Sequence, residues 1–260
     1  MFQKFAKADR KMAKQQSLYA YEDRYKKVFD AGGINWNNPK PNSELDMILK
    51  KIPQKGRCIE FGCGEGYQSR FVASKGFNVI GIDLSISAIM KAQRETPIGM
   101  AVSFIVGDIT EKSLLSLIEG TFDLAIDIGC LHMMAEQEDR NNYLSNVWSI
   151  LNERGLFYIQ EGIDLQTITP ESIEEAEQIK QLKEIQTRPT GTLLSRTITT
   201  IDNKKQIELP LCPKGKILSL EGYIDELKEN GFKMVSAKRK GGANQSYEAI
   251  ILSRKHITSR

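Results

Sequence analysis

Apolar and polar positions along the middle of the chain follow two alternating periods. Short runs of apolar and β-branched residues, typical of strands, are separated by stretches with the 3.6-residue spacing of amphipathic helices. This alternation predicts parallel strands with crossover helices on both faces, a doubly wound α/β sheet. The predicted strands are 57–61, 78–82, 104–106, 121–128 and 156–160, and the predicted helices begin near Tyr67 and cover 85–95 and 140–151.

The C-terminal part has a different pattern. A helix over 220–230 ends at Gly231, and two strand-like runs, 232–239 and 247–253, follow it. The glycine-rich turn between these runs suits an antiparallel hairpin that closes the edge of the sheet. With the five strands above, this hairpin completes a seven-stranded, mostly parallel, Rossmann-like sheet.

Residues 161–217 are too long for a simple connection between a strand and the next helix. The segment has its own pattern, a helix over 170–185 and two strand-like runs, 193–200 and 206–211, around a turn at Asp202-Asn203. We interpret it as an inserted lid or substrate segment. The alternative is a surface elaboration or an oligomer contact formed through the same residues.

The first 30 residues predict a basic helical arm, which Gly32-Gly33 ends. Ser43 is positioned to cap the helix that follows. The chain therefore divides into the arm, 1–42, and the main domain, 43–260. Because runs of charged residues usually face water, we interpret the basic arm as a solvated surface. A nucleic-acid contact is the alternative.

Composition narrows the class of protein. Of the 260 residues, 40% are hydrophobic and 27% are charged, which is typical of a folded globular chain. The net charge of +3 argues against a dedicated nucleic-acid binder, and no apolar run reaches the roughly 18 residues that span a membrane. An N-terminus without a signal-peptide pattern predicts a cytoplasmic protein. Neither a metal site nor a disulfide framework is expected from the cysteines, Cys58, Cys63, Cys130 and Cys212.

The sequence Ile59-Glu60-Phe61-Gly62-Cys63-Gly64-Glu65-Gly66 joins the first predicted strand to its helix. Glycines at alternate positions let the backbone turn tightly and approach a ligand, and the helix N-terminus behind them offers free N–H groups. A turn that binds nothing is the alternative.

Two carboxylates at the ends of the next strands favour a ligand. Asp83 can accept hydrogen bonds from both ribose hydroxyls of a nucleoside, and Asp108 can reach an adenine amine. Their alternatives are a helix N-cap and a turn residue. A dinucleotide site requires Gly or Ala at position 67, where the chain has Tyr67, and Glu60 and Glu65 would repel a pyrophosphate. These features favour S-adenosylmethionine over NAD.

With these motifs the chain resembles class I S-adenosylmethionine-dependent methyltransferases from about residue 22 to 255. The resemblance implies that Glu60 contacts the methionine ammonium, that the three glycines lie under the methionine, and that Asp83 binds the ribose. It also implies adenine contacts from Asp108 and Ile109. The implied cofactor-binding residues are Glu60, Gly62, Gly64, Gly66, Asp83, Leu84, Asp108, Ile109 and Ile128.

A narrower resemblance is carried by Tyr21-Glu22-Asp23-Arg24-Tyr25 and Gly33-Ile34-Asn35-Trp36. These segments are similar to the N-terminal segment of small-molecule methyltransferases of the thiopurine and tellurite-resistance type, in which the tryptophan and nearby aromatics cover the cofactor. The resemblance assigns the arm as a cofactor cover and Trp36 as a cofactor contact. A core aromatic under a loop is the alternative for Trp36.

Four residues are candidates for the acceptor side. His132 follows the fourth strand, where a base can take a proton from an acceptor, and Glu161 follows the fifth. A partly exposed histidine and a solvated carboxylate are the alternatives. Tyr21 and Tyr25 on the arm can line the acceptor pocket. Residues 127–132 lack the Asn/Asp-Pro-Pro-aromatic sequence of amide and adenine-amine methyltransferases, which argues against DNA-adenine and protein-glutamine acceptors.

The sequence therefore predicts a cytoplasmic S-adenosylmethionine-dependent methyltransferase with no membrane partner. It would transfer a methyl group by in-line displacement to an O, N or S nucleophile of a small molecule. Two alternatives stay open: a methyltransferase that acts on RNA or protein, which only the basic arm supports, and a protein that binds S-adenosylmethionine without catalysis.

Overall fold

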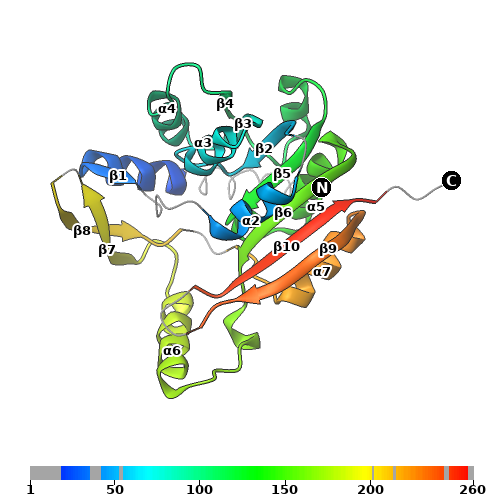
Figure 1. Cartoon of the computed structure of the whole chain (residues 1–260). Helices are drawn as coiled ribbons and strands as arrows, with labels where there is room; N and C mark the ends of the chain where they lie inside the picture. The colour runs from blue at the N-terminus through cyan, green and yellow to red at the C-terminus, as the bar shows by residue number, and fades with distance from the viewer. Residues whose placement is uncertain are drawn as a thin grey trace, which may run out of the picture.

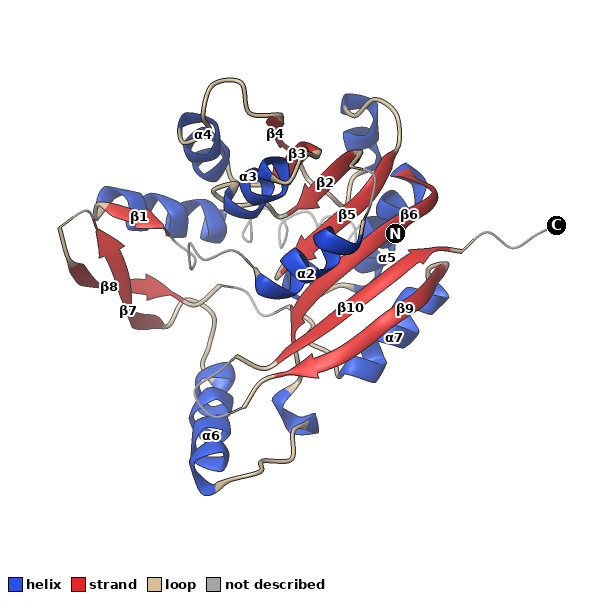
Figure 2. Ribbon diagram, viewed as in Figure 1, coloured by secondary structure: helices blue, strands red, loops and turns tan. Residues whose placement is uncertain are grey.

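The computed structural model describes residues 19–35, 42–52, 55–200, 202–212, 215–242 and 246–256. Its main part has three layers, a central sheet with helices on both faces (Figures 1 and 2). Within the described residues no helix is both long and apolar enough to cross a membrane. Trp36 and the first 18 residues lie outside the described ranges.

Seven strands form the central sheet, which confirms the predicted Rossmann-like topology. Five of them pair in parallel, and β10 pairs antiparallel with both β6 and β9, so β10 alone runs against the other six. The chain builds outward from β2 in one direction and then from β5 in the other, so the order reverses between these two strands. The strand order is β4 (Val102–Val106), β3 (Asn78–Asp83), β2 (Arg57–Phe61), β5 (Phe122–Ile128), β6 (Leu151–Gly162), β10 (Glu248–Lys255) and β9 (Phe232–Lys240).

Two apolar layers hold the helices against this sheet. Successive side chains of a strand point to opposite faces, so Cys58 packs in one layer and Ile59 in the other. The Cys58 layer is covered by α2 (Ser43–Lys51) and α3 (Tyr67–Ser74), and the Ile59 layer by α5 (Gln137–Ile150) and α7 (Leu220–Glu229). The remaining crossover helix, α4 (Ile86–Arg94), packs beside β3 and β4.

The N-cap predicted for α2 is wrong by one residue. Ser43 is the first helical residue, and Asn42 is the cap. The Asn42 side-chain oxygen accepts hydrogen bonds from the backbone N–H groups of Glu44 (3.0 Å) and Leu45 (3.1 Å). Asn and Ser are equally good caps, so residue type alone does not separate neighbouring positions.

The insertion contains the elements that its pattern predicts. A short 3-10 turn, η3 (Leu165–Thr167), leads to α6 (Ile173–Thr187), and β7 (Leu193–Thr200) pairs antiparallel with β8 (Lys204–Pro210). The feature that the sequence did not predict is β1 (Gly33–Asn35) of the arm, which pairs antiparallel with β7. Arm and insertion therefore share one three-stranded sheet, although they lie far apart in the sequence (Figure 1).

The described part of the arm is helical over residues 19–30, as the sequence predicts. Its Val28 is fully buried against Ile198 of β7 and Leu209 of β8. The arm helix and the hairpin therefore form a small apolar core of their own beside the central sheet.

Candidate functional site

The glycine-rich turn after β2 lies at the carboxyl edge of the sheet, where the strand order reverses. Gly62, Gly64 and Gly66 all have positive φ (66°, 52° and 71°), a backbone conformation that favours glycine. A Cβ atom on Gly62 would lie 2.7 Å from Cys130 Sγ, and one on Gly64 would lie 2.7 Å from the Tyr25 hydroxyl. The turn is therefore packed closely between the loop after β5 and the arm helix.

Gly66 is the left-handed N-cap of α3, and no side chain caps this helix. The helix N-terminus accordingly faces the turn with backbone N–H groups, as the motif predicts. A Cβ atom on Gly66 would lie 2.4 Å from the Phe104 ring, so packing alone already requires glycine here. Tyr67 follows as the first residue of α3.

Asp83 joins the turn to the start of α4. One carboxylate oxygen accepts from Gly64 N–H (2.8 Å) and the other from Ser85 N–H (2.8 Å). Ser85, and not Asp83, caps α4, because its hydroxyl accepts from Ala88 N–H at 3.1 Å. Burial raises the pKa of Asp83, and the backbone hydrogen bonds oppose that rise.

Two further carboxylates lie on either side of Asp83 in the strand order. Glu60 on β2 is 3% exposed and accepts a hydrogen bond from the Ser69 hydroxyl; burial raises its pKa to about 7. Asp108 after β4 accepts from the backbone N–H (2.9 Å) and hydroxyl (2.7 Å) of Thr110. The predicted carboxylates therefore end three neighbouring strands.

The remaining predicted cofactor residues are apolar, and they differ from one another in how deeply they are buried. Leu84 and Ile128 are half-buried at the ends of β3 and β5, whereas Ile109 is 8% exposed and belongs to the main core. Trp36 lies outside the described residues.

The arm is fastened to the start of α4 by a residue that sequence reasoning missed. Glu22 accepts hydrogen bonds from the hydroxyls of Ser85 (2.6 Å) and Ser87 (2.6 Å) and from Ser87 N–H (3.2 Å). Burial works to raise the pKa of Glu22, but these hydrogen bonds outweigh it and lower the pKa. A carboxylate at a helix N-terminus is also favoured by the helix dipole.

Lys91 of α4 makes a second connection between the arm and the turn. It is 4% exposed, and its Nζ donates to the Gly33 carbonyl (3.1 Å) and lies 3.5 Å from Glu65 Oε2 and 4.3 Å from the centre of the Phe29 ring. Lys91 offsets the negative charge of Glu65. Of the two carboxylates predicted to repel a pyrophosphate, Glu65 therefore contributes less than Glu60.

His132 and Glu161 are in direct contact on the other side of the switch point. Glu161 Oε2 meets His132 Nδ1, and the carboxylate also accepts from the backbone N–H groups of Leu131 (2.9 Å), Cys130 (3.1 Å) and His132 itself (3.2 Å). Glu161 is 1% exposed, so the alternative of a solvated carboxylate is excluded. Burial lowers the pKa of His132 and raises that of Glu161.

Three buried residues that sequence reasoning missed support this pair. Asp127 accepts from Cys130 N–H (2.8 Å) and the Tyr143 hydroxyl (2.7 Å), and burial raises its pKa well above the usual range. Arg140 donates to the Leu131 carbonyl (2.7 Å) and to the carbonyl of Lys216 (3.0 Å). The loop that carries His132 is therefore held by β5, α5 and the end of the insertion.

Tyr21 and Tyr25 lie on different parts of the site. The Tyr25 hydroxyl lies against Gly64, and burial and the Asp83 charge raise its pKa. The Tyr21 hydroxyl is buried and has no hydrogen-bond partner among the described residues, and it interacts electrostatically with Cys212 and Cys130. Beside it, Arg24 donates to Cys212 Sγ at 3.1 Å.

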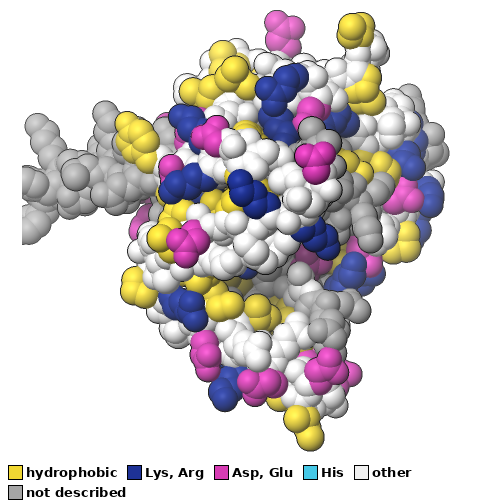
Figure 3. Space-filling model, turned by 90° about the vertical axis from the view of Figure 1, so that its left-hand side faces the viewer, with side chains coloured by type: hydrophobic (Ala, Val, Ile, Leu, Met, Phe, Trp, Pro, Cys, Tyr) yellow, Lys and Arg dark blue, Asp and Glu magenta, His cyan; other side chains and the backbone are white. Residues whose placement is uncertain are grey.

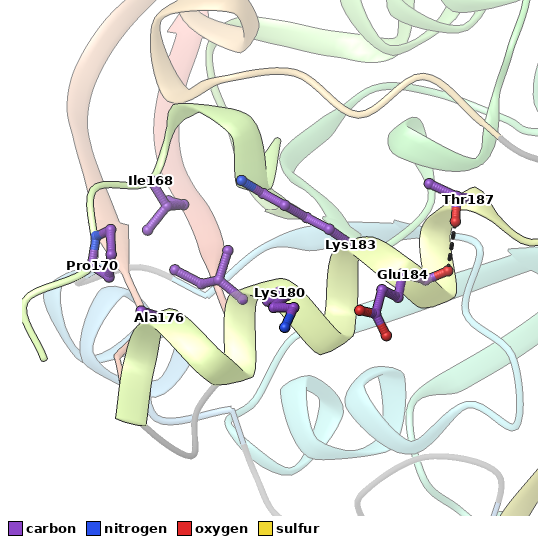
Figure 4. Close-up of a pocket in the computed structure, with 8 residues that line it drawn as sticks. Ile168, Pro170, Ala176, Lys180, Lys183, Glu184 and Thr187 are labelled. Atoms are coloured by element: carbon purple, nitrogen blue, oxygen red, sulfur yellow. Dashed lines mark hydrogen bonds between the residues drawn. The ribbon is translucent and has the colours of Figure 1, made fainter. Parts of the chain in front are cut away.

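The insertion also carries a groove of about 440 Å³ along α6 (Figure 4). Ile168 and Pro170 lie across from the helix, and Lys180 and Lys183 leave it in different directions. None of the lining residues is a predicted site residue, so this groove is separate from the cluster at the carboxyl edge.

Residues 58–155 match the model of a methyltransferase domain. The putative methyltransferase YqeM of Bacillus subtilis is 30% identical over 129 residues, which are 48% of this chain and 51% of that relative. The chain thus spans about half the length of this curated relative.

Solved structures share the fold. An S-adenosylmethionine-dependent methyltransferase of Clostridium acetobutylicum gives a TM-score of 0.59 at 12% identity, covering 82% of this chain and 89% of that one. The 1,6-didemethyltoxoflavin-N1-methyltransferase of Burkholderia thailandensis, with bound S-adenosylhomocysteine, gives 0.58 at 17% identity, covering 92% and 88%.

The matches and the strand order agree. Residues 58–155 match a methyltransferase domain, and the chain shares its fold with solved S-adenosylmethionine-dependent methyltransferases.

Proposed function

We propose that the protein transfers the methyl group of S-adenosylmethionine to a small-molecule acceptor. The observation that carries the proposal is the row of carboxylates, Glu60, Asp83 and Asp108, at three neighbouring strand ends beside the glycine-rich turn. The cofactor presents three matching groups of donors, which are an ammonium, a pair of ribose hydroxyls and an adenine amine.

The chemistry of the turn fits this cofactor better than a dinucleotide. Acceptor-only carboxylates suit hydrogen-bond donors and repel a pyrophosphate, and Tyr67 occupies the position that a dinucleotide site reserves for a small residue. In our assignment Glu60 holds the ammonium, Asp83 the ribose and Asp108 the adenine amine, with Gly62, Gly64 and Gly66 under the methionine. The apolar residues Leu84, Ile109 and Ile128, and Trp36, stay predicted contacts.

The arm and the insertion support a small acceptor. The β1–β7 pairing and the Arg24–Cys212 contact bring the described part of the arm, 19–35, against the insertion beside the carboxyl edge. A Cβ atom on Gly215, at the end of the insertion, would lie 1.8 Å from the His132 carbonyl oxygen, so the insertion also contacts the acceptor-side loop. We therefore assign 1–42 as a cofactor cover, 161–217 as a lid and 43–260 as the methyltransferase domain.

The narrower likeness to the thiopurine and tellurite-resistance group is part of the proposal. It rests on the arm sequence, and the placement of Tyr25 against Gly64 supports a cofactor cover of that kind. Four free cysteines support the predicted cytoplasmic location, because the cytoplasm keeps thiols reduced.

A methyltransferase that acts on RNA is the second candidate, and the basic arm is its support. An RNA-binding surface is expected to carry a continuous basic patch. On the face drawn in Figure 3 basic and acidic side chains are interspersed, which argues against an RNA acceptor. A protein that binds the cofactor without catalysis is the third.

Two measurements test these functions. Thermal stability should rise with S-adenosylhomocysteine and not with NAD, since a ligand that binds only the folded state stabilises it by mass action. Incubation with methyl-labelled S-adenosylmethionine should then label a small-molecule extract of the host cells and leave total RNA and protein unlabelled. Stabilisation without any labelling would identify a non-catalytic binder, and a larger shift with NAD would overturn the cofactor assignment.

A further inference from the structure

We propose that the acceptor atom is a hydroxyl oxygen and that His132 is the base that removes its proton, with Glu161 as the positioning residue. The inference rests on the proposed methyl transfer and names the chemical class of its acceptor. It also departs from the toxoflavin enzyme with the same fold, whose name gives a nitrogen acceptor.

The contacts of Glu161 determine which ring nitrogen of His132 is available. Glu161 is held by three successive backbone N–H groups and meets the ring at Nδ1. A carboxylate at Nδ1 favours the tautomer that carries its proton there and leaves the Nε2 lone pair unprotonated. The His132 side chain is 22% exposed, so the ring can reach a ligand in the crevice.

The charges around the ring match a base that cycles between neutral and protonated forms. Glu161 on β6 and Asp127 on β5 face it as acidic groups, and Arg140 on α5 opposes protonation. Cys130, Tyr143 and Tyr223 are further titratable groups near these charges. Burial lowers the pKa of His132 and so favours the neutral imidazole. The Glu161 carboxylate at Nδ1 favours the imidazolium that forms after proton transfer.

A hydroxyl is the acceptor that requires such a pair. A neutral amine attacks with its own lone pair and a thiol ionises readily, whereas an alcohol or phenol must lose its proton as the new bond forms. Bound S-adenosylmethionine supplies the electrophilic methyl group and keeps the electron pair of the broken C–S bond on sulfur. The acceptor oxygen forms the new O–C bond, its proton moves to His132 Nε2, and solvent removes that proton after product release.

The first test uses S-adenosylmethionine with a ¹³C-labelled methyl group and the small-molecule extract of the host cells. The ¹³C shift of the transferred methyl distinguishes O-, N-, S- and C-methyl products without identifying the acceptor. We expect an O-methyl signal whose rate of appearance falls about 10²- to 10⁴-fold in His132→Gln. The matched control is His256→Gln, which replaces the only other histidine, an exposed one, and keeps the wild-type rate.

An N- or S-methyl product, or an undiminished O-methyl rate in His132→Gln, would overturn the inference and leave the proposed function intact. An absence of any labelled product would instead overturn the proposed function. Calorimetry with S-adenosylhomocysteine should give unchanged affinity for His132→Gln, which shows that the variant is folded.

The second test addresses the positioning role. With two histidines in the chain, ¹⁵N spectra of the rings resolve the His132 tautomer directly. We expect protonated Nδ1 and unprotonated Nε2 in the wild type. In Glu161→Gln the His132 pKa should fall, because the anion that stabilises the imidazolium is removed, so the acidic limb of the rate profile moves to lower pH as the rate drops. A wild-type tautomer protonated at Nε2, or a pH limb that Glu161→Gln leaves in place, contradicts the assignment.

Discussion

The two sides of the switch point are built in different ways. On the cofactor side, the turn after β2 and the end of β3 contact each other across only 19 positions of sequence, as in the bond from Gly64 N–H to Asp83. On the acceptor side, His132 depends on Glu161, on Arg140 and on the end of the insertion at Lys216, which come from separate elements. Short motifs therefore specify cofactor binding, whereas the acceptor pocket depends on long-range packing.

The electrostatics of the two sides differ as well. Asp83 is satisfied by backbone N–H groups and is ready to accept further donors. Asp127 and Glu161 lie in one buried region, where burial and then the charge of Glu161 raise the pKa of Asp127. The first arrangement suits a fixed binding site. The second suits a site that gains and loses a proton.

Removal of the β7–β8 hairpin should have the largest effect, because we expect it to abolish methyl transfer while cofactor binding is retained. Replacing residues 192–211 with a short Gly/Ser linker removes the partner strand of β1 and both strands of the proposed lid. We expect S-adenosylhomocysteine affinity to remain within a few-fold and methylation of the extract to be lost, as measured by calorimetry and methyl labelling. Lys204→Ala on the exposed hairpin surface is the control and should keep both properties. Retained methylation would place the acceptor pocket elsewhere.

Arg140 should have the next largest effect, on stability. It forms a buried ion pair with Glu226 (Nε–Oε1, 2.6 Å), so Arg140→Met leaves a buried carboxylate without its counter-charge and should cost about 3–5 kcal/mol in urea unfolding. The double variant Arg140→Met/Glu226→Leu should recover most of that stability. It should not recover methyl transfer, because the hydrogen bonds to the His132 loop are still missing. Full recovery of both would mean that the loop does not depend on Arg140.

Asp83 tests the cofactor side alone. Asp83→Asn keeps the shape and should weaken S-adenosylhomocysteine binding more than tenfold, since charge-assisted hydrogen bonds contribute about 1.5–3 kcal/mol each. Asp225→Asn on the exposed surface of α7 is the control. An unchanged dissociation constant in the Asp83 variant would remove Asp83 from the cofactor site.

Glu22 should have the smallest effect, on the closure of the arm. Glu22→Gln keeps the side-chain shape but loses its charge at the start of α4, which is comparable to the loss of a helix cap, about 0.5–2 kcal/mol. The folded-state pKa of Glu22 is lowered, so its contribution is complete above about pH 4.3 and is lost as pH falls through the lowered value. Protease cleavage in residues 19–30 measures closure. Equal cleavage rates at pH 7 for the variant and wild type would show that Glu22 does not fasten the arm.

The sequence predicted the regular elements well because their signals are local. The glycine turn, the strand ends with Asp83 and Asp108, and the insertion hairpin all follow from spacing within short windows. His132 and Glu161 were identified separately as strand-end residues, but their contact follows from the parallel pairing of β5 with β6. Adjacent parallel strands bring their carboxyl ends together, so the strand order would have been enough to predict that pair.

Other parts of the site gave no local signal. Asp127 reads as one polar residue in a buried strand, and Arg140 and Glu226 read as ordinary surface charges of helices. Glu22 and Lys91 act through contacts with residues more than 50 positions away. The pairing of β1 with β7 likewise depends on the fold and not on either segment alone.

Hydrogen exchange with and without S-adenosylhomocysteine tests whether the cofactor binds at the carboxyl edge of the sheet, because it reports each region separately. We expect protection of the glycine turn at 60–66, of 83–88, and of the arm at 19–30, with little change in the α6 groove. Protection confined to residues 168–187, around that groove, would contradict the assignment of the cofactor site to the carboxyl edge of the sheet.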